Sequence, residues 1–276
     1  MTLFLLVQIK QNAFFCMMNE NFNESFRKKI DQFLPSVSID LVVFGFHENQ
    51  LKILLLKNKD KLSWGLPSGF IFLNEDLEDA AKRILTEKTG IENIFLRQFH
   101  VFGRANRTRE NNREALLEEQ LVQDDTADEI KRWILSRFVT VGYYALLEYT
   151  EVKIRPDIFS LDCSWHDINA IPPVISDHNA IIDAALQTLR QQVHYEPVGM
   201  NLLPEEFTLP ELQRLYETIL GKSIDRRNFQ KKMLSYNIVS RLPRKRTGGA
   251  YRSPYLYRFD EEHYAQALKS GLKDLW

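Results

Sequence analysis

The sequence predicts an α+β protein of two domains, an α/β/α sandwich followed by a winged helix-turn-helix domain. Three observations predict this fold. The 276 residues are 44% hydrophobic and 26% charged, which is ordinary for a soluble globular protein of about two domains. Strand-like segments and two amphipathic helices share residues 37–197. Two helices and a two-stranded hairpin follow in residues 198–276.

Residues 1–36 are predicted to form an N-terminal arm. Residues 1–18 are apolar, but Lys10 interrupts them and no small-residue cleavage site follows. We therefore expect neither a signal peptide nor a membrane span, and Met17 or Met18 is an alternative start. The two cysteines have no metal-ligand or disulfide spacing. A reduced, cytoplasmic setting without a cofactor is expected.

The first domain is predicted from strands and one long terminal helix. Residues 19–35 favour a short leading helix, and residues 176–193 favour a helix with one apolar face. Five segments have the β-branched and aromatic composition of strands: 37–46, 51–57, 94–102, 138–147 and 159–165. The first two, joined by the turn HENQ, form a predicted hairpin with a strongly buried face.

Residues 64–91 read as a strand end, a glycine loop and one amphipathic helix. Asn74 is the predicted N-cap, and Gly90 stands where a left-handed C-terminal residue belongs. The periodicity alone fits any amphipathic helix after a turn. The detailed spacing, however, resembles the Nudix box, G-x5-E-x7-R-E-U-x-E-E-x-G-U, in which U is aliphatic. The matching residues are Gly69, Glu75, Arg83, Leu85, Glu87, Gly90 and Ile91.

Two departures from that pattern change its chemistry. The family places carboxylates at positions 84, 87 and 88, where this chain has Ile84, Glu87 and Lys88. Positions i, i+3 and i+4 share a helical face, so three carboxylates there would hold Mg²⁺. The substitutions change the local formal charge from −3 to 0. We therefore predict no metal site, no catalytic residue and an inactive relative of the Nudix hydrolases.

Residues 106–137 are predicted to be an insertion between two strands. They hold eight acidic and six basic residues, and residues 124–133 favour a helix with Ile130, Trp133 and Ile134 on one side. A functional lid, a partner contact and a solvated loop all fit this composition. His166 and His178 stand apart from other ligands, so a surface or capping role is favoured over metal binding for both.

The second domain begins with a strong helix signal. Thr208 and Glu211 form a predicted capping box, and Gly221 ends the helix. A second helix starts at Asp225 or Ser223 and has an apolar side of Phe229, Met233 and Leu234. Residues 238–242 and 255–259 then pair as strands around a basic loop. This order of elements is that of a winged helix.

Positive charge is concentrated in this second domain. Eleven basic residues and one acid lie between Lys222 and Arg258, which makes the block +10 and the remainder −11. We predict that the second helix reads the major groove of DNA and that the wing contacts phosphates. The predicted DNA-binding residues are Arg226, Arg227, Gln230, Lys231, Arg244, Lys245, Arg246 and Arg252.

The two halves together resemble the Nudix-related transcriptional regulators, on the evidence of the altered box and the stretch LLPEEFTLPELQRLYETILGKSIDRRNFQKKM. The resemblance implies a homodimer whose Nudix-like domain binds a small effector and whose winged helices bind a pseudopalindromic operator. Some members sense ADP-ribose or related NAD metabolites, and a branch in gut bacteria responds to pentoses such as arabinose. The expected effector-binding residues here are Arg83, Glu87, Lys88 and Arg104.

Two other functions remain open at this point. One is a Mg²⁺-dependent Nudix hydrolase of a nucleoside diphosphate derivative, with an accessory nucleic-acid-binding domain. It would need Glu75 and Glu87, with acids of the insertion, to hold the metal. The other is an RNA-binding scaffold without a small ligand.

Overall fold

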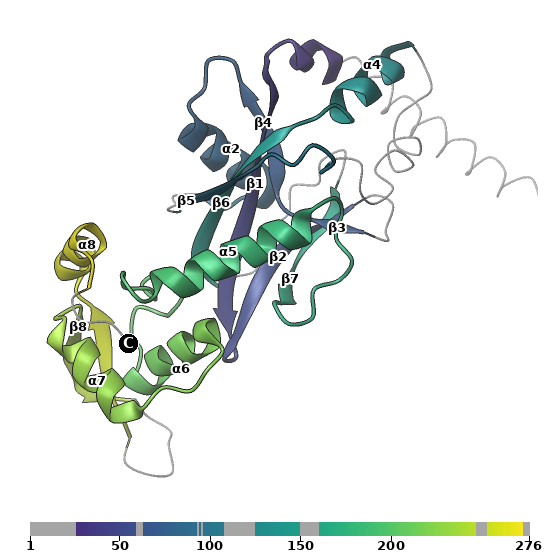
Figure 1. Cartoon of the computed structure of the whole chain (residues 1–276). Helices are drawn as coiled ribbons and strands as arrows, with labels where there is room; N and C mark the ends of the chain where they lie inside the picture. The colour runs from purple at the N-terminus through teal and green to yellow at the C-terminus, as the bar shows by residue number, and fades with distance from the viewer. Residues whose placement is uncertain are drawn as a thin grey trace, which may run out of the picture.

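A mixed seven-stranded sheet forms the centre of the first domain in the computed structural model (Figure 1). The structure describes residues 26–58, 63–92, 94, 96–107, 125–149, 160–246 and 253–272. The main strand order is β3-β2-β1-β6-β5, with β4 paired to β1 and β7 paired to β2. The strands are β1 (Phe33–His47), β2 (Gln50–Asn58), β3 (Trp64–Gly65), β4 (Ser68–Phe72), β5 (Leu96–Phe102), β6 (Val139–Glu148) and β7 (Ser160–Asp167).

The predicted hairpin of β1 and β2 is confirmed, and its tight turn is formed by two residues of the predicted HENQ turn. Glu48 and Asn49 both have positive φ, 49° and 61°, as a two-residue hairpin turn with the favoured twist requires. β1 also pairs with β6 in parallel, from Val37↔Val139 to Phe46↔Glu148. β1 thus lies at the centre of the sheet, which accounts for its unbroken apolar run.

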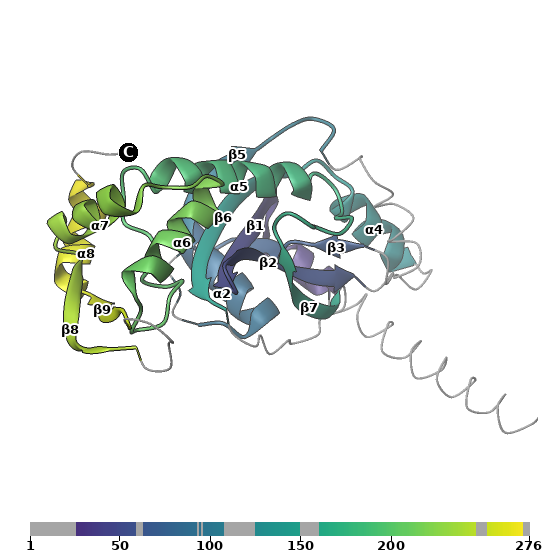
Figure 2. The ribbon, with the colours of Figure 1, turned by 90° about the horizontal axis from the view of Figure 1, so that it is seen from below.

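Two helices cover the two faces of this sheet, α2 (Leu77–Thr89) on one side and α5 (His178–Gln192) on the other (Figure 2). Alternate residues of β1 serve the two layers. Ile39, Leu41 and Val43 belong to the core beneath α2, whereas Val42 and Phe44 belong to the core beneath α5. The predicted α/β/α sandwich is therefore confirmed.

The end of the predicted insertion forms a helix, α4 (Asp125–Ile134), that packs onto the protein body. Ile130 and Ile134 are buried with Phe26 and Phe33 in a third core cluster. Rings from β1, β4, α4 and the residues just before β1 and β6 form one aromatic cluster there. They are Phe26, Phe33, Phe70, Phe72, Trp133 and Phe138. This end of the insertion is thus part of the fold, while residues 108–124 lie outside the described residues.

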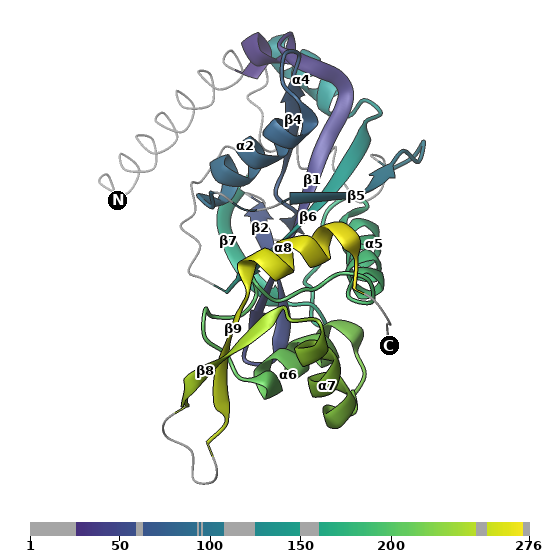
Figure 3. The same ribbon diagram turned by 90° about the vertical axis from the view of Figure 1, so that its left-hand side faces the viewer.

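The second domain is a winged helix. Its elements are α6 (Leu209–Leu220), α7 (Arg226–Ser235), β8 (Val239–Lys245), β9 (Tyr255–Phe259) and α8 (Glu261–Ser270). Figure 3 shows the β8–β9 hairpin and α7 at the end of the molecule far from α4. The capping box is present in full, since the Thr208 side chain accepts from the Glu211 N–H while the Glu211 carboxylate accepts from the Thr208 N–H.

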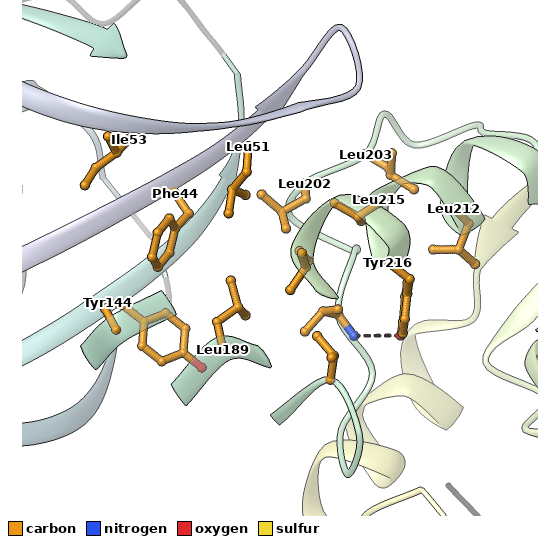
Figure 4. Packing of buried hydrophobic residues seen from close by; sticks show 14 of the residues in the cluster. Phe44, Leu51, Ile53, Tyr144, Leu189, Leu202, Leu203, Leu212, Leu215 and Tyr216 are labelled. Carbon is orange, nitrogen blue, oxygen red and sulfur yellow. Dashed lines mark hydrogen bonds between the residues drawn. The ribbon is translucent and has the colours of Figure 1, made fainter. Parts of the chain in front are cut away.

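The two domains share one hydrophobic core. A single buried cluster runs from Phe44 of β1 through Leu189 of α5 to Leu215 of α6 (Figure 4). The chain between the domains belongs to this cluster, because Val198, Leu202, Leu203 and Phe207 are all buried. The buried Tyr216 hydroxyl also hydrogen-bonds the backbone N–H of Val198, at 3.2 Å.

Several predicted details were wrong. The N-cap of α2 is Asp76 instead of Asn74. β1 begins at Phe33, before the predicted residue 37, because Phe33 joins the aromatic cluster and pairs with Phe72. Leu234 is 44% exposed, because the buried side of α7 is complete with Phe229 and Met233.

Two further points concern the helices. The last helix, α8, was not predicted, although Asp260 caps it and its Tyr264 is buried. No helix in the described ranges combines the length and apolarity needed to cross a membrane.

Candidate functional site

The glycine at the start of the box lies in strand β4, not in a loop as predicted, and it packs directly against the helix that follows. Gly69 lies opposite Ile39 of β1, and its α-carbon faces Ile84 of α2. A β-carbon at Gly69 would come within 2.8 Å of the Ile84 Cγ1, so the glycine is required by this close approach. The Ile84 side chain is buried and belongs to the core beneath α2. An apolar group therefore fills the space at the family's first carboxylate position.

The carboxylates that remain in the box are engaged by one arginine. Arg83 binds Glu75 in a bidentate pair, with its Nε and one Nη each 2.7 Å from a carboxylate oxygen. Its other Nη is 3.2 Å from Glu87, while the Nη that binds Glu75 also donates to the Phe70 carbonyl oxygen at 2.8 Å. The guanidinium lies over the Phe72 ring, 4.4 Å from its centroid. The hydrogen bond from Arg83 lowers the pKa of the Glu75 carboxyl.

Lys88 occupies the family's last carboxylate position. Desolvation by burial lowers the pKa of its ammonium to about 8, and the positive charge of Arg83 also lowers it, while Glu87 raises it. Arg83, Glu87 and Lys88 thus lie together on α2. Arg104 is exposed after β5, and across the described chain no hydrogen bond or ion pair joins its side chain to these three. The structure therefore brings together three of the four predicted effector residues.

A buried polar cluster that the sequence analysis missed lies on the α5 face of the sheet. Arg107 has a side chain only 6% exposed, and it reaches two carboxylates. Its Nε and one Nη are each 2.9 Å from Asp177, just before α5, and the same Nη is 3.3 Å from Asp40 of β1. Its other Nη donates to Thr140 of β6. These bonds outweigh the effect of burial and raise the pKa of the guanidinium.

The cluster adjoins the start of β4. Asp40 pairs across the sheet with Ser68, the residue before Gly69. His178, the first residue of α5, accepts a hydrogen bond on Nδ1 from the Leu66 N–H at 2.9 Å. Its Nε2 is 3.8 Å from Asp40. His178 is therefore buried and not at the surface, and it ties α5 to the chain between β3 and β4.

His166 has a different setting. Its Nε2 is 2.9 Å from the Ser164 hydroxyl, its ring meets Trp64 edge-on, and burial lowers the pKa of the imidazole. No group of three or more His, Cys, Asp or Glu side chains suited to a metal ion occurs in the ranges that the structure describes.

The exposed face of α7 carries the predicted DNA-binding side chains of the second domain. Arg226, Arg227 and Lys231 are exposed, whereas Gln230 is half-buried. Asn228 and Ser235 are also exposed on this face and were not predicted. Their positions relative to the buried Phe229 and Met233 could have indicated them, because the outer face of a helix lies opposite its buried stripe.

Two basic side chains of the wing are paired with acidic residues, which the sequence did not predict. Arg244 forms an ion pair with Glu206, and Arg246 lies 2.9 Å from Glu211, the capping-box residue. Lys245 lies over the Tyr255 ring, 4.8 Å from its centroid. Arg252 lies outside the described residues. Two of the predicted phosphate contacts are therefore partly neutralised by acids of the same domain.

Comparison with known families accounts for both halves of the chain. The model of the NUDIX domain matches residues 35–183, more than half of the sequence. The chain belongs to the Nudix family. A second model, described as the NrtR DNA-binding winged helix domain, matches residues 199–259. The Nudix sheet and the winged helix of this protein thus correspond to two matched families in the order that the sequence predicts.

Proteins similar over most of this chain include one of known structure. This Nudix protein is 28% identical over 244 residues to the ADPR responsive transcriptional repressor NtrR of Acinetobacter baylyi, covering 86% of this chain and 87% of the relative. The crystal structure of Shewanella oneidensis NrtR complexed with a 27mer DNA is similar, with 27% identity and a TM-score of 0.65. The match covers 87% of this chain and 99% of that one.

The fold is also similar to that of a MutT/nudix family protein from Enterococcus faecalis. That match has a TM-score of 0.59 and 23% identity, and it covers 86% of this chain and 93% of the other.

Proposed function

We propose that this protein is a transcriptional regulator that binds operator DNA through its winged helix and senses a small effector through its Nudix domain. One observation carries the proposal: a Nudix box whose first carboxylate position is filled by Ile84 is joined in one chain to a winged helix with an exposed basic α7. The similarity to NrtR, crystallised with DNA, supports the same reading. Such a protein would work in the cytoplasm.

The box residues do not fit a magnesium centre. Ile84 packs on Gly69, Lys88 brings an ammonium group, and Glu75 and Glu87 are both bound to Arg83. Mg²⁺ prefers several oxygen ligands and waters in octahedral geometry, which this set does not offer. We infer that Ile84 and Lys88 abolish metal-assisted hydrolysis and leave a binding domain.

We propose an effector of the ADP-ribose type. Its support is the relative from Acinetobacter, whose name describes an ADPR-responsive repressor. The charged side chains Arg83, Lys88 and Arg104 suit an anionic, hydroxyl-rich ligand, with Glu87 accepting from hydroxyls. A pentose such as arabinose would need the hydroxyl contacts only. An effector acts on transcription only if it binds the DNA-competent and incompetent states with different affinity.

The test uses the full-length protein and duplexes that it selects from a random library. We expect enrichment of a pseudopalindromic sequence, since a homodimer would present two winged helices. Adding ADP-ribose or arabinose to the complex identifies the effector by a change in DNA affinity. Failure to enrich any sequence would contradict the proposal. Turnover of ADP-ribose with Mg²⁺ that is lost in Glu87→Gln would instead establish a hydrolase.

Binding to RNA can be distinguished from binding to DNA. A competition between the selected duplex and an RNA duplex of the same sequence separates the two, because α7 fits the wide major groove of B-form DNA and not the narrow one of A-form RNA. We expect the RNA to compete only at low salt.

A further inference from the structure

A groove with a volume of about 630 Å³ lies beside α7, between that helix and the turn 221–224. We call it the turn groove. Its polar lining comes from the turn and from one stripe of α7: Lys222, Ser223, Asn228, Lys231, Lys232 and Ser235. The four α7 residues are spaced i, i+3, i+4 and i+7, so they share one side of the helix. No residue of β8 or β9 lines it.

The turn groove is electropositive. It holds three ammonium groups and one carboxylate, Asp225, whose Oδ1 already accepts the Asn228 N–H at 2.9 Å as the cap of α7. Neither Lys222 nor Lys231 has an ion pair with any carboxylate of the described chain. The charge of Lys222, together with the larger effect of burial, lowers the pKa of the nearby His194.

The wall of the groove is preformed. The Ile224 N–H donates to Glu217 of α6 at 2.9 Å, and Gln213 donates to both that carboxylate and the Ile224 carbonyl oxygen, each at 3.0 Å. These bonds fix the turn to α6 before any ligand arrives. A site whose backbone is already ordered loses less conformational entropy on binding.

We infer that the turn groove binds a phosphodiester of the DNA backbone, and this inference rests on the proposed function. A helix in the major groove, which is about 12 Å wide, has a sugar–phosphate strand on each side. The β8–β9 wing serves one strand, and the turn groove serves the other. Its lysines match the anion, and the Ser223 and Asn228 side chains donate to phosphate oxygens, whereas the Ser235 hydroxyl already donates to the Lys232 carbonyl oxygen at 2.8 Å. A single aromatic ring, Tyr236, lines it, so it suits a backbone better than stacked bases.

The inference also reassigns the DNA-facing side chains. Lys231 borders the groove and so contacts phosphate, although the α7 sequence placed it among the base-reading residues. Arg226 and Gln230 do not line the groove. Base reading is therefore left to Arg226, Arg227 and Gln230, while Lys222 and Lys232 become anchors that were absent from the predicted set.

The experiment combines a protein change with a single change in the DNA. Lys222→Gln and Lys232→Gln are made in the full-length protein, with Lys269→Gln, an exposed lysine of α8, as the matched control. The duplex selected by the wild-type protein is prepared with one neutral methylphosphonate at each backbone position in turn. Dissociation constants are measured over a range of salt concentrations.

We expect one methylphosphonate position per half-site to weaken wild-type binding but to leave the Lys222→Gln and Lys232→Gln variants unaffected. These variants should lower the salt slope by about 0.9 per lost phosphate contact. They should weaken binding to selected and unrelated duplexes by the same factor. The Lys269→Gln control should behave as wild type at every position.

The outcomes separate the groove from the function. If the wild type binds DNA sequence-specifically and both groove variants keep its salt slope, phosphate binding by the turn groove is refuted, and the proposed regulator function is not. Absence of any duplex binding would overturn both. Inorganic tripolyphosphate serves as the free-anion probe. If the groove variants lose its binding, measured by calorimetry, but keep the wild-type response to every methylphosphonate, the groove takes a free anion and not DNA.

Discussion

Replacement of Arg107 by methionine tests the buried cluster that joins β1, β6 and α5. Methionine keeps the apolar stem and removes the guanidinium. Asp40 and Asp177 would then remain as buried carboxylates, 5% and 12% exposed, without their cation. Breaking a buried pair by removing one partner costs about 3–5 kcal/mol. Asp177 keeps the favourable field of the α5 N-terminus. Asp40, whose remaining charged neighbour would be the His178 ring at 3.8 Å, therefore dominates the loss.

The assay is urea denaturation followed by tryptophan fluorescence. Three of the four tryptophans, at positions 64, 133 and 165, lie in the Nudix domain, so the signal reports the part that contains Arg107. Arg137→Met is the matched control, because Arg137 is exposed and donates one hydrogen bond to the Gly103 carbonyl oxygen. It should cost about 1 kcal/mol or less.

A double variant makes the reasoning refutable. Adding Asp40→Asn to Arg107→Met removes the orphaned charge, so the pair should be less destabilised than the sum of the single changes by about 1–3 kcal/mol. An Arg107→Met variant as stable as the Arg137→Met control would refute the argument. Strict additivity of the two changes would refute the claim that Arg107 acts through Asp40.

Three further predictions follow from the box and the helix cap. Gly69→Ala should lower the free energy of unfolding by about 1–3 kcal/mol because its β-carbon would clash with Ile84. Ile84→Ala should relieve that clash, so the double variant should lose less stability than the sum of the two single variants, as measured by urea denaturation. Lys88→Met should raise the melting temperature at pH 7. The pKa of Lys88 is about 8 in the folded state and 10.5 in the unfolded state, so the free-energy cost of burying its charged form is complete below pH 8. The gain in melting temperature of the variant should therefore shrink as the pH rises from 8 to 10.5. A gain that stays constant over this pH range would contradict the prediction. Thr208→Ala should cost about 1 kcal/mol by removing the cap of α6, whereas Thr208→Ser should keep most of it; equal losses, measured by thermal denaturation, would exclude a capping role.

Local patterns predicted most of the fold. The β1–β2 hairpin, α2, α5 and the capping box of α6 depend on the order of apolar, polar and glycine residues within a short stretch, so the sequence shows them directly. α8 was missed, although Asp260 and the two glutamates that follow it form a recognisable helix start. The helix α4 was predicted, but its burial depends on aromatic rings contributed by distant strands.

The candidate site was less predictable, because its contacts are long-range. Ile84 and Lys88 could be recognised because the box has a fixed spacing. Arg107 could not, since its partners lie 67 and 70 residues away and it stands in a stretch rich in both charges. The pairing of Arg244 and Arg246 with acids also depends on how the wing folds back onto α6. Charge counts along the sequence therefore overstate how much of the wing is available to DNA.

The chain between the two domains has a consequence for how a dimer would respond to its effector. Val198, Leu202 and Phe207 are packed into the same core as Tyr216, so this chain is a rigid connection and not a flexible linker. The winged helix cannot swivel on its own Nudix domain without opening that core. The spacing between two DNA-reading helices would then change only when whole protomers rotate against each other. An effector would therefore act by changing the contact between subunits, and the packing between the two domains of each protomer would stay the same.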